Sequence, residues 1–121
     1  MLYALLCYNN EAEVFAWDQD QDAAVMARLE VVQQKLDQAG KLGPSLRLLP
    51  TTAATTLRKD QDLIIDGPYA ETKEQLLGFY LLDIDGLEEG LEIARELAAA
   101  NPGGAYEIRP IGFFRPGKAL G

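Results

Sequence analysis

Several side chains capable of acid–base chemistry are concentrated in one short segment, "DGPYAETKEQ", at residues 66–75. Asp66 could act as a general acid or base if apolar neighbours raise the pKa of its carboxyl group. Lys73 could neutralise the charge of a substrate carboxylate or enolate, and Thr72 could donate a hydrogen bond to the same group. This combination would suit proton transfer at a small anionic substrate.

The same residues also have ordinary structural interpretations. The Asp66 carboxylate can accept a hydrogen bond from a backbone amide two residues on, which forms an Asx turn. Glu71 and Lys73 can be solvated surface charges, which contribute little to stability. Tyr69 combines an apolar ring with a polar tip and suits either a pocket wall or a packing position. The residue types alone leave both interpretations open.

Further side chains could reach this site from neighbouring strands. Tyr8 closes the first predicted strand and Arg58 closes another, so both could lie at the mouth of one cleft. Each is also commonly found as a plain surface residue. Together with Tyr69 and Phe79, they would form the wall of a cleft that binds a small molecule.

Histidine is absent from the 121-residue sequence. This excludes Ser-His-Asp and Cys-His catalysis, zinc sites that contain histidine, and the side chain best suited to proton transfer near neutral pH. The one cysteine, Cys7, lies in an apolar run, which predicts a buried, inert thiol in a reducing compartment. Any acid–base chemistry must therefore use carboxylates, lysine, tyrosine or Cys7.

The composition also restricts the classes of partner. The 19 acidic and 11 basic residues give a formal net charge of −8, which argues against nucleic acid and anionic membrane surfaces. The apolar start, residues 1–10, is too short to span a membrane and lacks the basic flank and cleavage site of a signal peptide. We expect a cytoplasmic protein.

No metal or cofactor site is expected from the motifs. Asp18, Asp20 and Asp22 alternate as in a calcium-binding loop, but the positions that need glycine and glutamate hold Ala23 and Leu29. Helix capping explains these aspartates better. The glycine-rich patterns that hold phosphates, GxGxxG and GxxxxGK[ST], are also absent.

The positioning elements can be predicted from hydrophobic periodicity. A continuous apolar run predicts a strand over residues 2–8, and a polar loop should follow, anchored by Val14, Phe15 and Trp17. Helical spacing predicts a helix over residues 22–39, capped by Asp20 or Asp22 and followed by Gly40. Its apolar positions are Val25, Leu29, Val32 and Leu36.

The second half of the chain alternates between strand and helix patterns. A hairpin pairs residues 51–57 with residues 63–65 and ends at Asp66. A strand over residues 76–84 precedes a helix that starts with a capping-box-like pair, Asp85 and Glu88. A last strand, "AYEIRPI", ends the domain at residue 111, and residues 112–121 form a tail.

This order, β-α-β-(hairpin)-β-α-β, predicts a ferredoxin-like α+β fold with two helices on one side of an antiparallel sheet. The strands carry apolar residues on both faces. By numbering alone, Leu5 and Phe79 share one parity, and Leu6 and Tyr80 share the other. Because one layer of helices covers one face, we expect the second face to pack against another copy in a homodimer.

The chain resembles the YCII-related proteins that carry a DGPF motif. The resemblance rests on "DGPYAETKEQLLGFYLLDID", "YALLCY", "TTAATTLR" and "YEIRPI", and spans residues 1–111. It departs at Tyr69, where phenylalanine is usual. It implies a dimeric α+β barrel with a cleft near this motif, whose expected ligand is a small anionic metabolite.

The resemblance leaves two classes of function open. Cofactor-independent proton transfer, or a lyase or isomerase step, would use Asp66 as the acid or base, with Lys73, Glu71 and Thr72 beside it. The histidine–aspartate pair proposed for related YCII proteins cannot be carried over, because this chain has no histidine. Alternatively, the protein is a non-catalytic partner or sensor module of transcriptional regulation, because some relatives are thought to be encoded beside sigma factors.

Overall fold

A computed structural model describes residues 1–120, and Gly121, the last residue of the predicted tail, lies outside the described part. The elements run in the order β1 (Leu2–Asn9), α1 (Glu11–Val14), α2 (Gln19–Gln38), β2 (Leu42–Arg47), a short 3₁₀ helix (Thr51–Ala53), β3 (Thr55–Arg58), β4 (Leu63–Asp66), β5 (Gln75–Asp83), α3 (Leu87–Ala100) and β6 (Ala105–Pro110).

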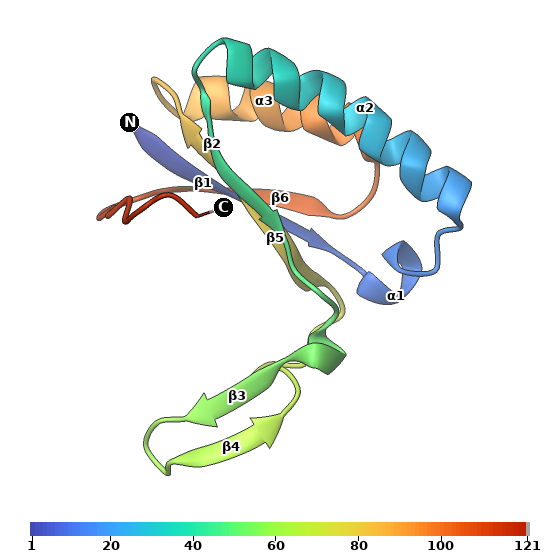
Figure 1. The fold of residues 1–121 in the computed structure, drawn as a ribbon, viewed down its shortest axis with the longest axis vertical. Coiled ribbons are helices and arrows are strands. Elements are labelled where there is room, and N and C mark those ends of the chain that lie inside the picture. Colours follow the sequence, from blue (N-terminus) through green and yellow to red (C-terminus); the bar gives the residue numbers. More distant parts are fainter. Residues whose placement is uncertain (121) are drawn as a thin grey trace.

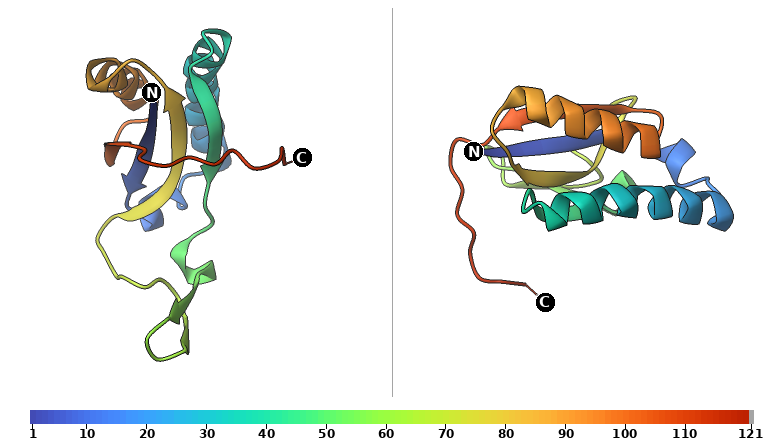
Figure 2. Two further views of the ribbon diagram at one scale, coloured as in Figure 1. Left: turned by 90° about the vertical axis from the view of Figure 1, so that its left-hand side faces the viewer. Right: turned by 90° about the horizontal axis from the view of Figure 1, so that it is seen from above.

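Four strands form an antiparallel sheet in the order β2-β5-β1-β6, and β3 pairs with β4 in a separate hairpin. The helices α2 and α3 lie side by side on one face of the sheet (Figures 1 and 2). The helix α2 connects β1 to β2, and α3 connects β5 to β6. The predicted ferredoxin-like α+β fold is confirmed, with the hairpin inserted between its second and third sheet strands.

The helix α2 begins three residues earlier than predicted. Asp18 has an extended backbone, and its carboxylate accepts a hydrogen bond from the backbone N–H of Gln21 at 2.7 Å. Asp20 and Asp22 therefore lie in the first turn, where the helix dipole favours negative charge, and the prediction that one of them caps the helix was wrong. After the helix, Gly40 adopts the expected left-handed conformation, with φ 71°.

The loop after β1 contains a helical turn that the sequence did not predict. The side chain of Asn10 caps α1 by accepting a hydrogen bond from the N–H of Glu13 at 3.1 Å. Val14 is buried and Trp17 is half-buried, but Phe15 is exposed. Two of the three predicted anchors therefore hold this segment against the body of the protein.

The start of α3 differs from the predicted capping box. Gly86 occupies the cap position, and no side chain caps the helix there. Glu89, rather than Glu88, reaches back to the backbone N–H of Asp85, at 3.3 Å. The reciprocal bond from an aspartate side chain is absent, because the extra residue Gly86 moves Asp85 out of the cap position.

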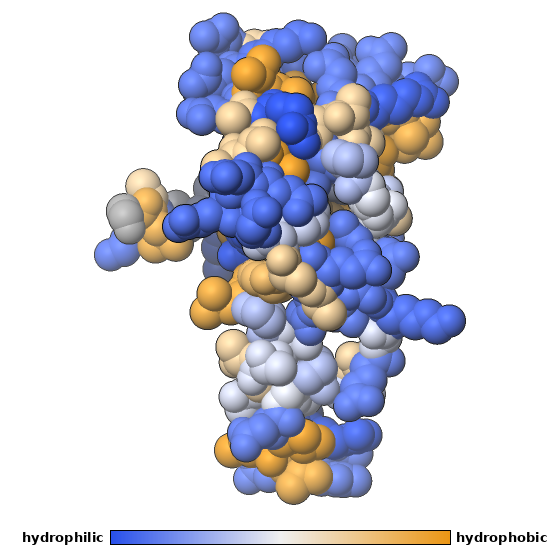
Figure 3. Space-filling model, turned by 90° about the vertical axis from the view of Figure 1, so that its right-hand side faces the viewer, coloured by the Kyte–Doolittle hydropathy of each residue, from blue (hydrophilic) through white to orange (hydrophobic). Residues whose placement is uncertain are grey.

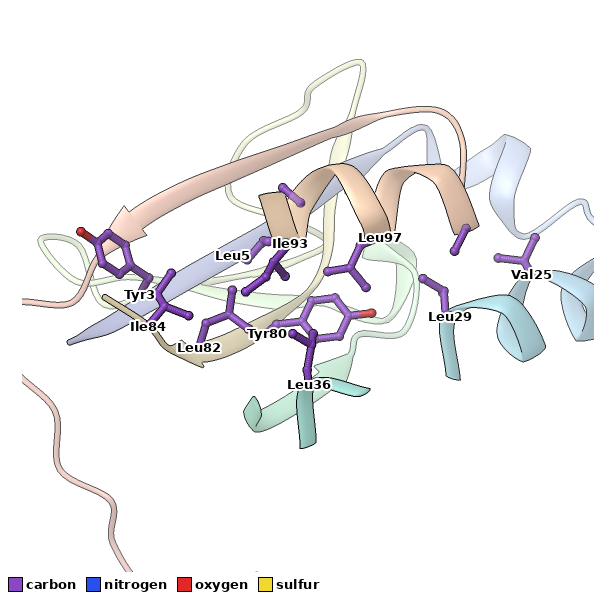
Figure 4. Close-up of a cluster of buried hydrophobic side chains, with 12 residues drawn as sticks. Tyr3, Leu5, Val25, Leu29, Leu36, Tyr80, Leu82, Ile84, Ile93 and Leu97 are labelled. Carbon is purple, nitrogen blue, oxygen red and sulfur yellow. The ribbon is translucent and has the colours of Figure 1, made fainter. Parts of the chain in front are cut away.

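The hydrophobic core fills the space between the sheet and the two helices (Figure 4). Leu5, Leu82 and Leu97 are completely buried, and each contributes about 1.5–3 kcal/mol to stability. The register pairs Leu5 with Tyr80 and Leu6 with Phe79. Odd-numbered residues of β1 therefore share the core face with even-numbered residues of β5, so the grouping by number parity was wrong.

The opposite face of the sheet carries half-buried apolar side chains. Leu6 pairs with Phe79, and Ala4 pairs with Leu81, in the register that points away from the helices. No helix among residues 1–120 covers that face (Figure 2). The face is therefore the part of the sheet that a second molecule could cover.

The β3–β4 hairpin projects away from the rest of the fold (Figure 1). It exposes Leu57, Leu63 and Ile64, and Ile64 is 69% exposed. Figure 3 shows hydrophobic atoms gathered at this end of the molecule. A two-stranded hairpin is marginally stable by itself in water, so these aliphatic side chains suit contact with a partner.

Candidate functional site

A cavity of about 300 Å³ lies between the sheet and α2. Its wall is mostly apolar and is built by side chains from both halves of the chain, because β1 and β6 are adjacent in the sheet. The residues that line it include Cys7, Trp17, Leu29, Gln33, Tyr80, Asn101 and Tyr106. Cavities of this size suit a compact ligand.

Gly78 lets the strands around this cavity approach one another. A Cβ atom at Gly78 would lie 2.2 Å from the carbonyl oxygen of Leu46 on β2. Only glycine permits so close an approach of two backbones. The pairing of β1 with β5 also shifts by one residue between Cys7 and Tyr8, directly beside Gly78. The cavity therefore lies where the regular sheet is interrupted.

The cavity wall also contains polar groups. The side-chain N–H of Gln33 donates a hydrogen bond to the Tyr80 hydroxyl, at 2.9 Å. Figure 4 shows this hydroxyl directed toward Leu29, along α2. The Asn101 carbonyl oxygen, Oδ1, is buried and has no hydrogen-bond partner among residues 1–120. A buried acceptor without a partner costs about 1–3 kcal/mol, but Oδ1 has almost no accessible surface, so a ligand in the cavity does not reach it without a shift of the side chain.

The ionisable groups deep in the cavity are neutral near pH 7. Burial raises the pKa of the Cys7 thiol to about 12. Burial also raises the pKa of Tyr80, although the hydrogen bond from Gln33 opposes the rise. The pKa of Tyr106 is raised by burial and by the proximity of Cys7, while a side-chain hydrogen bond with Asn101 opposes the change. The predicted inert thiol at Cys7 fits this environment, because thiolate is the reactive form.

Two charged side chains lie at the exposed edge of the cavity. Arg47 of β2 and Asp22 of α2 line it, and their side chains are 45% and 42% exposed. Their closest charged atoms, Nη1 and Oδ1, are 3.6 Å apart. The guanidinium group of Arg47 also lies over the Phe15 ring, 5.4 Å from its centroid. The cavity therefore has a neutral interior and a charged opening.

A second, more polar groove of about 520 Å³ lies beside the DGPY segment. It brings together Asp66, Glu71 and Thr72, three of the residues predicted from the sequence. Thr51 also lines it, and the Thr51 backbone N–H and hydroxyl both donate hydrogen bonds to the Glu11 carboxylate. Both charged side chains that line this groove are acidic.

The other predicted site residues lie elsewhere. Tyr8 lines the cavity under α2, whereas Lys73 and Phe79 line neither space. Arg58 lies over the ring of Tyr69, at 5.5 Å from its centroid, and Tyr69 is largely exposed. The eight predicted residues are thus divided among the groove, the cavity, the hairpin, the loop between β4 and β5 and the second face of the sheet.

The turn at Asp66 differs from the expected Asx turn. The residue two positions on is Pro68, which has no backbone N–H to donate. The Asp66 carboxylate is exposed and has no hydrogen-bond partner in the described part of the chain. Gly67 makes the turn instead, with φ 109° and with its N–H bonded to the carbonyl of Ala54 at 2.7 Å.

Sequence reasoning missed most of the cavity. Tyr80 was recognised as part of an alternating strand, and Leu29 as part of a helix stripe. Asn101 and Arg47 carried no motif, and Tyr106 was noted only as part of the "YEIRPI" strand. These residues come from separate elements, so no local spacing could have grouped them.

The described part of the chain shows neither a metal-binding cluster nor a membrane-spanning helix. Residues 1–120 contain no cluster of three or more potential metal-ligating side chains. None of the helices in this range has both the length and the apolar character that crossing a membrane requires.

The fold and the cavity define a small ferredoxin-like α+β domain with an inserted hairpin and an open cavity of about 300 Å³ beneath α2. The chain belongs to the YCII-related family, whose domain model, "YCII-related domain", matches residues 1–115. It is also similar to an uncharacterised protein of Rhizobium meliloti (strain 1021). The two are 54% identical over 121 residues, which is 98% of each chain.

Proposed function

We propose that this YCII-family protein is a homodimer that binds a small molecule in the cavity between α2 and the sheet. The carrying observation is a mostly apolar space of about 300 Å³ whose wall also presents polar side chains, among them Gln33 and Tyr80. A ligand with a compact apolar body would fill this space.

The cavity supports binding more strongly than catalysis. Its interior ionisable groups, Cys7, Tyr80 and Tyr106, have raised pKa values and stay protonated near neutral pH. A general base must be deprotonated in order to accept a proton. The proposed function is therefore recognition of a metabolite, in the cytoplasm as expected from the single free thiol.

The homodimer is supported by the second face of the sheet. Leu6, Phe79 and Leu81 form a half-buried apolar surface on the side opposite the helices. Packing two such faces together would remove this surface from water, at about 25 cal/mol for each Å² of apolar area.

The groove beside the DGPY segment is the second candidate site. Its specific support is that Asp66, Glu71 and Thr72 lie together there. Cofactor-independent acid–base chemistry would use Asp66 with Glu71 and Thr72, as the resemblance implies. Lys73 does not line the groove, and its side chain would have to move in order to take part. Because the charged groups that line it are carboxylates, the groove favours an anionic ligand less than the cavity does.

A non-catalytic partner or sensor module is the alternative function. The exposed aliphatic side chains of the projecting hairpin, Leu57, Leu63 and Ile64, support it as a contact surface. A partner protein that binds this hairpin independently of the cavity would favour this alternative.

Trp17 provides a direct test of ligand binding, because it is the one tryptophan of the chain and lines the cavity. Phenol, indane and cyclohexanol should be titrated while Trp17 fluorescence and the thermal midpoint are recorded. A bound compound should change the fluorescence saturably and raise the midpoint. Leu29→Phe narrows the cavity and should weaken binding, whereas Leu57→Phe makes the same change on the exposed hairpin and should not.

Two outcomes would contradict the cavity as the site. Binding that survives Leu29→Phe but is lost in Asp66→Ala would assign the ligand to the DGPY groove. No binding of any of the three compounds at millimolar concentration would remove support for a small apolar ligand.

A further inference from the structure

The charged residues at the opening of the cavity indicate which class of ligand the cavity binds. This inference rests on the proposed function. Arg47 is the one cationic side chain among the residues that line the cavity. Its guanidinium group is half-exposed, so it can meet a ligand that enters from solvent. The ion partner of this group within the chain is Asp22.

The contact between Arg47 and Asp22 is loose. Hydrogen bonds of this kind have donor–acceptor distances of about 2.7–3.2 Å, and the closest approach here is 3.6 Å. A guanidinium group carries five N–H donors, and those of Arg47 make no hydrogen bond to the described part of the chain. Ion pairs this exposed contribute about 0–1 kcal/mol, so the contact with Asp22 can be exchanged at little cost.

Phe15 holds the guanidinium group without using its donors. The Arg47 charge lies over the face of the Phe15 ring, 5.4 Å from the centroid. Stacking of this type leaves the N–H groups at the edge of the guanidinium plane available. Arg47 is therefore positioned at the opening, with donors free to form a two-bonded contact with a carboxylate.

The interior of the cavity restricts where a ligand charge can lie. Cys7, Tyr80 and Tyr106 are neutral near pH 7, and none of them could compensate a buried anion. A negative charge is therefore compatible with the opening and incompatible with the interior.

We propose that the cavity selects compact monocarboxylates, with the apolar body inside and the carboxylate bound by Arg47 in exchange for Asp22. In this arrangement Arg47 is a specificity-determining residue. Asp22 acts as a competitor that keeps the site paired in the absence of ligand.

The test compares phenylacetate with phenylacetamide, which have the same body and differ in charge. The wild-type protein should bind phenylacetate about tenfold more tightly than the amide, as expected for a charge-assisted hydrogen bond. Arg47→Gln should reduce this preference to less than about threefold, because it removes the cation that binds the carboxylate. Asp22→Asn should tighten phenylacetate binding, because the competing carboxylate is removed. Titration calorimetry measures all of these affinities.

Arg58→Gln is the matched control. Arg58 lies over the ring of Tyr69 at 5.5 Å, much as Arg47 lies over Phe15, but it is outside the cavity lining. This variant should retain the full preference for phenylacetate. Circular dichroism and thermal unfolding should confirm that each variant is folded.

The outcomes separate this inference from the proposed function. Equal affinity of the wild type for acid and amide, or a preference that survives Arg47→Gln, would overturn the role of Arg47 and leave the cavity as a binding site. Loss of the preference in Arg58→Gln would assign selection to the hairpin. Absence of binding of both probes, together with the three neutral compounds above, would overturn the inference and the proposed function.

Discussion

Gln33 of α2 donates a hydrogen bond to the hydroxyl of Tyr80 on β5, with 2.9 Å between Nε2 and Oη. The Tyr80 ring is buried in the core, while its hydroxyl borders the cavity. This bond therefore joins the helix that roofs the cavity to the sheet that forms its floor. It also shows how one residue can contribute to the core and to the candidate site.

Replacing Tyr80 by phenylalanine should test the strength of this link. Tyr80→Phe keeps the buried ring and removes the hydrogen bond, so the free energy of unfolding should fall by about 1 kcal/mol. Urea unfolding measures the change. Tyr3→Phe is the matched control, because Tyr3 is equally buried and its hydroxyl has no partner among residues 1–120. Equal losses in the two variants would contradict a contribution from the bond to Gln33.

The turn after β4 should depend on Gly67 rather than on the Asp66 side chain. Asp66→Ala removes an exposed carboxylate without a hydrogen bond and should change the free energy of unfolding by less than about 0.5 kcal/mol. Gly67→Ala forces a side chain into φ 109° and should destabilise the protein by about 1 kcal/mol or more. Chemical denaturation measures the free energy of unfolding of both variants and shows which of the two residues the turn depends on. A larger loss in Asp66→Ala would restore a structural role for its carboxylate.

Stability should fall at alkaline pH because of the cavity thiol. The pKa of Cys7 rises from an ordinary 9.0 to about 12 in the folded protein, through burial. Below pH 9 both states are protonated, and between pH 9 and 12 the unfolded state releases its proton first. Unfolding is then favoured as pH rises, by at most about 1.4 kcal/mol per pH unit for one group.

The raised pKa values of Tyr80 and Tyr106 act in the same direction above pH 10. Urea unfolding at pH 8, 9 and 10 measures the slope. Cys7→Ala should unfold with a shallower dependence on pH between 9 and 10, because it lacks the thiol. An unchanged slope in Cys7→Ala would show that the thiol does not contribute.

The proposed homodimer should depend on the second face of the sheet. Leu81→Asp places a charge on that face and should convert the protein to a monomer at micromolar concentration, because a buried, unpaired charge opposes association. Light scattering measures the mass. Leu87→Asp, on the exposed surface of α3, is the control and should remain dimeric. A wild-type protein that is monomeric at this concentration would contradict the proposal.

The sequence by itself determined the order of the main elements. Hydrophobic periodicity located both long helices and β1, β4, β5 and β6, since the pattern of burial along each element is local. It gave no range for β2, and the strand predicted over residues 51–57 was wrong at its start, because Thr51–Ala53 form a 3₁₀ helix and β3 begins at Thr55. The helix ends were less accurate, because several aspartates near Asp18 could each cap α2 and only the backbone conformation selects one. The glycine after α2 was predicted, since a left-handed residue at that position strongly favours glycine.

Only the tertiary structure decided which residues share a face, a groove or a cavity. The register of β1 against β5 set Leu5 beside Tyr80, and numbering contains no information about register. Asp66, Glu71 and Thr72 lie together because they are neighbours in sequence. Arg47, Asn101 and Tyr106 reach one cavity because the sheet order β2-β5-β1-β6 brings distant segments together. Such contacts are set by packing over long separations along the chain, and local spacing therefore cannot reveal them.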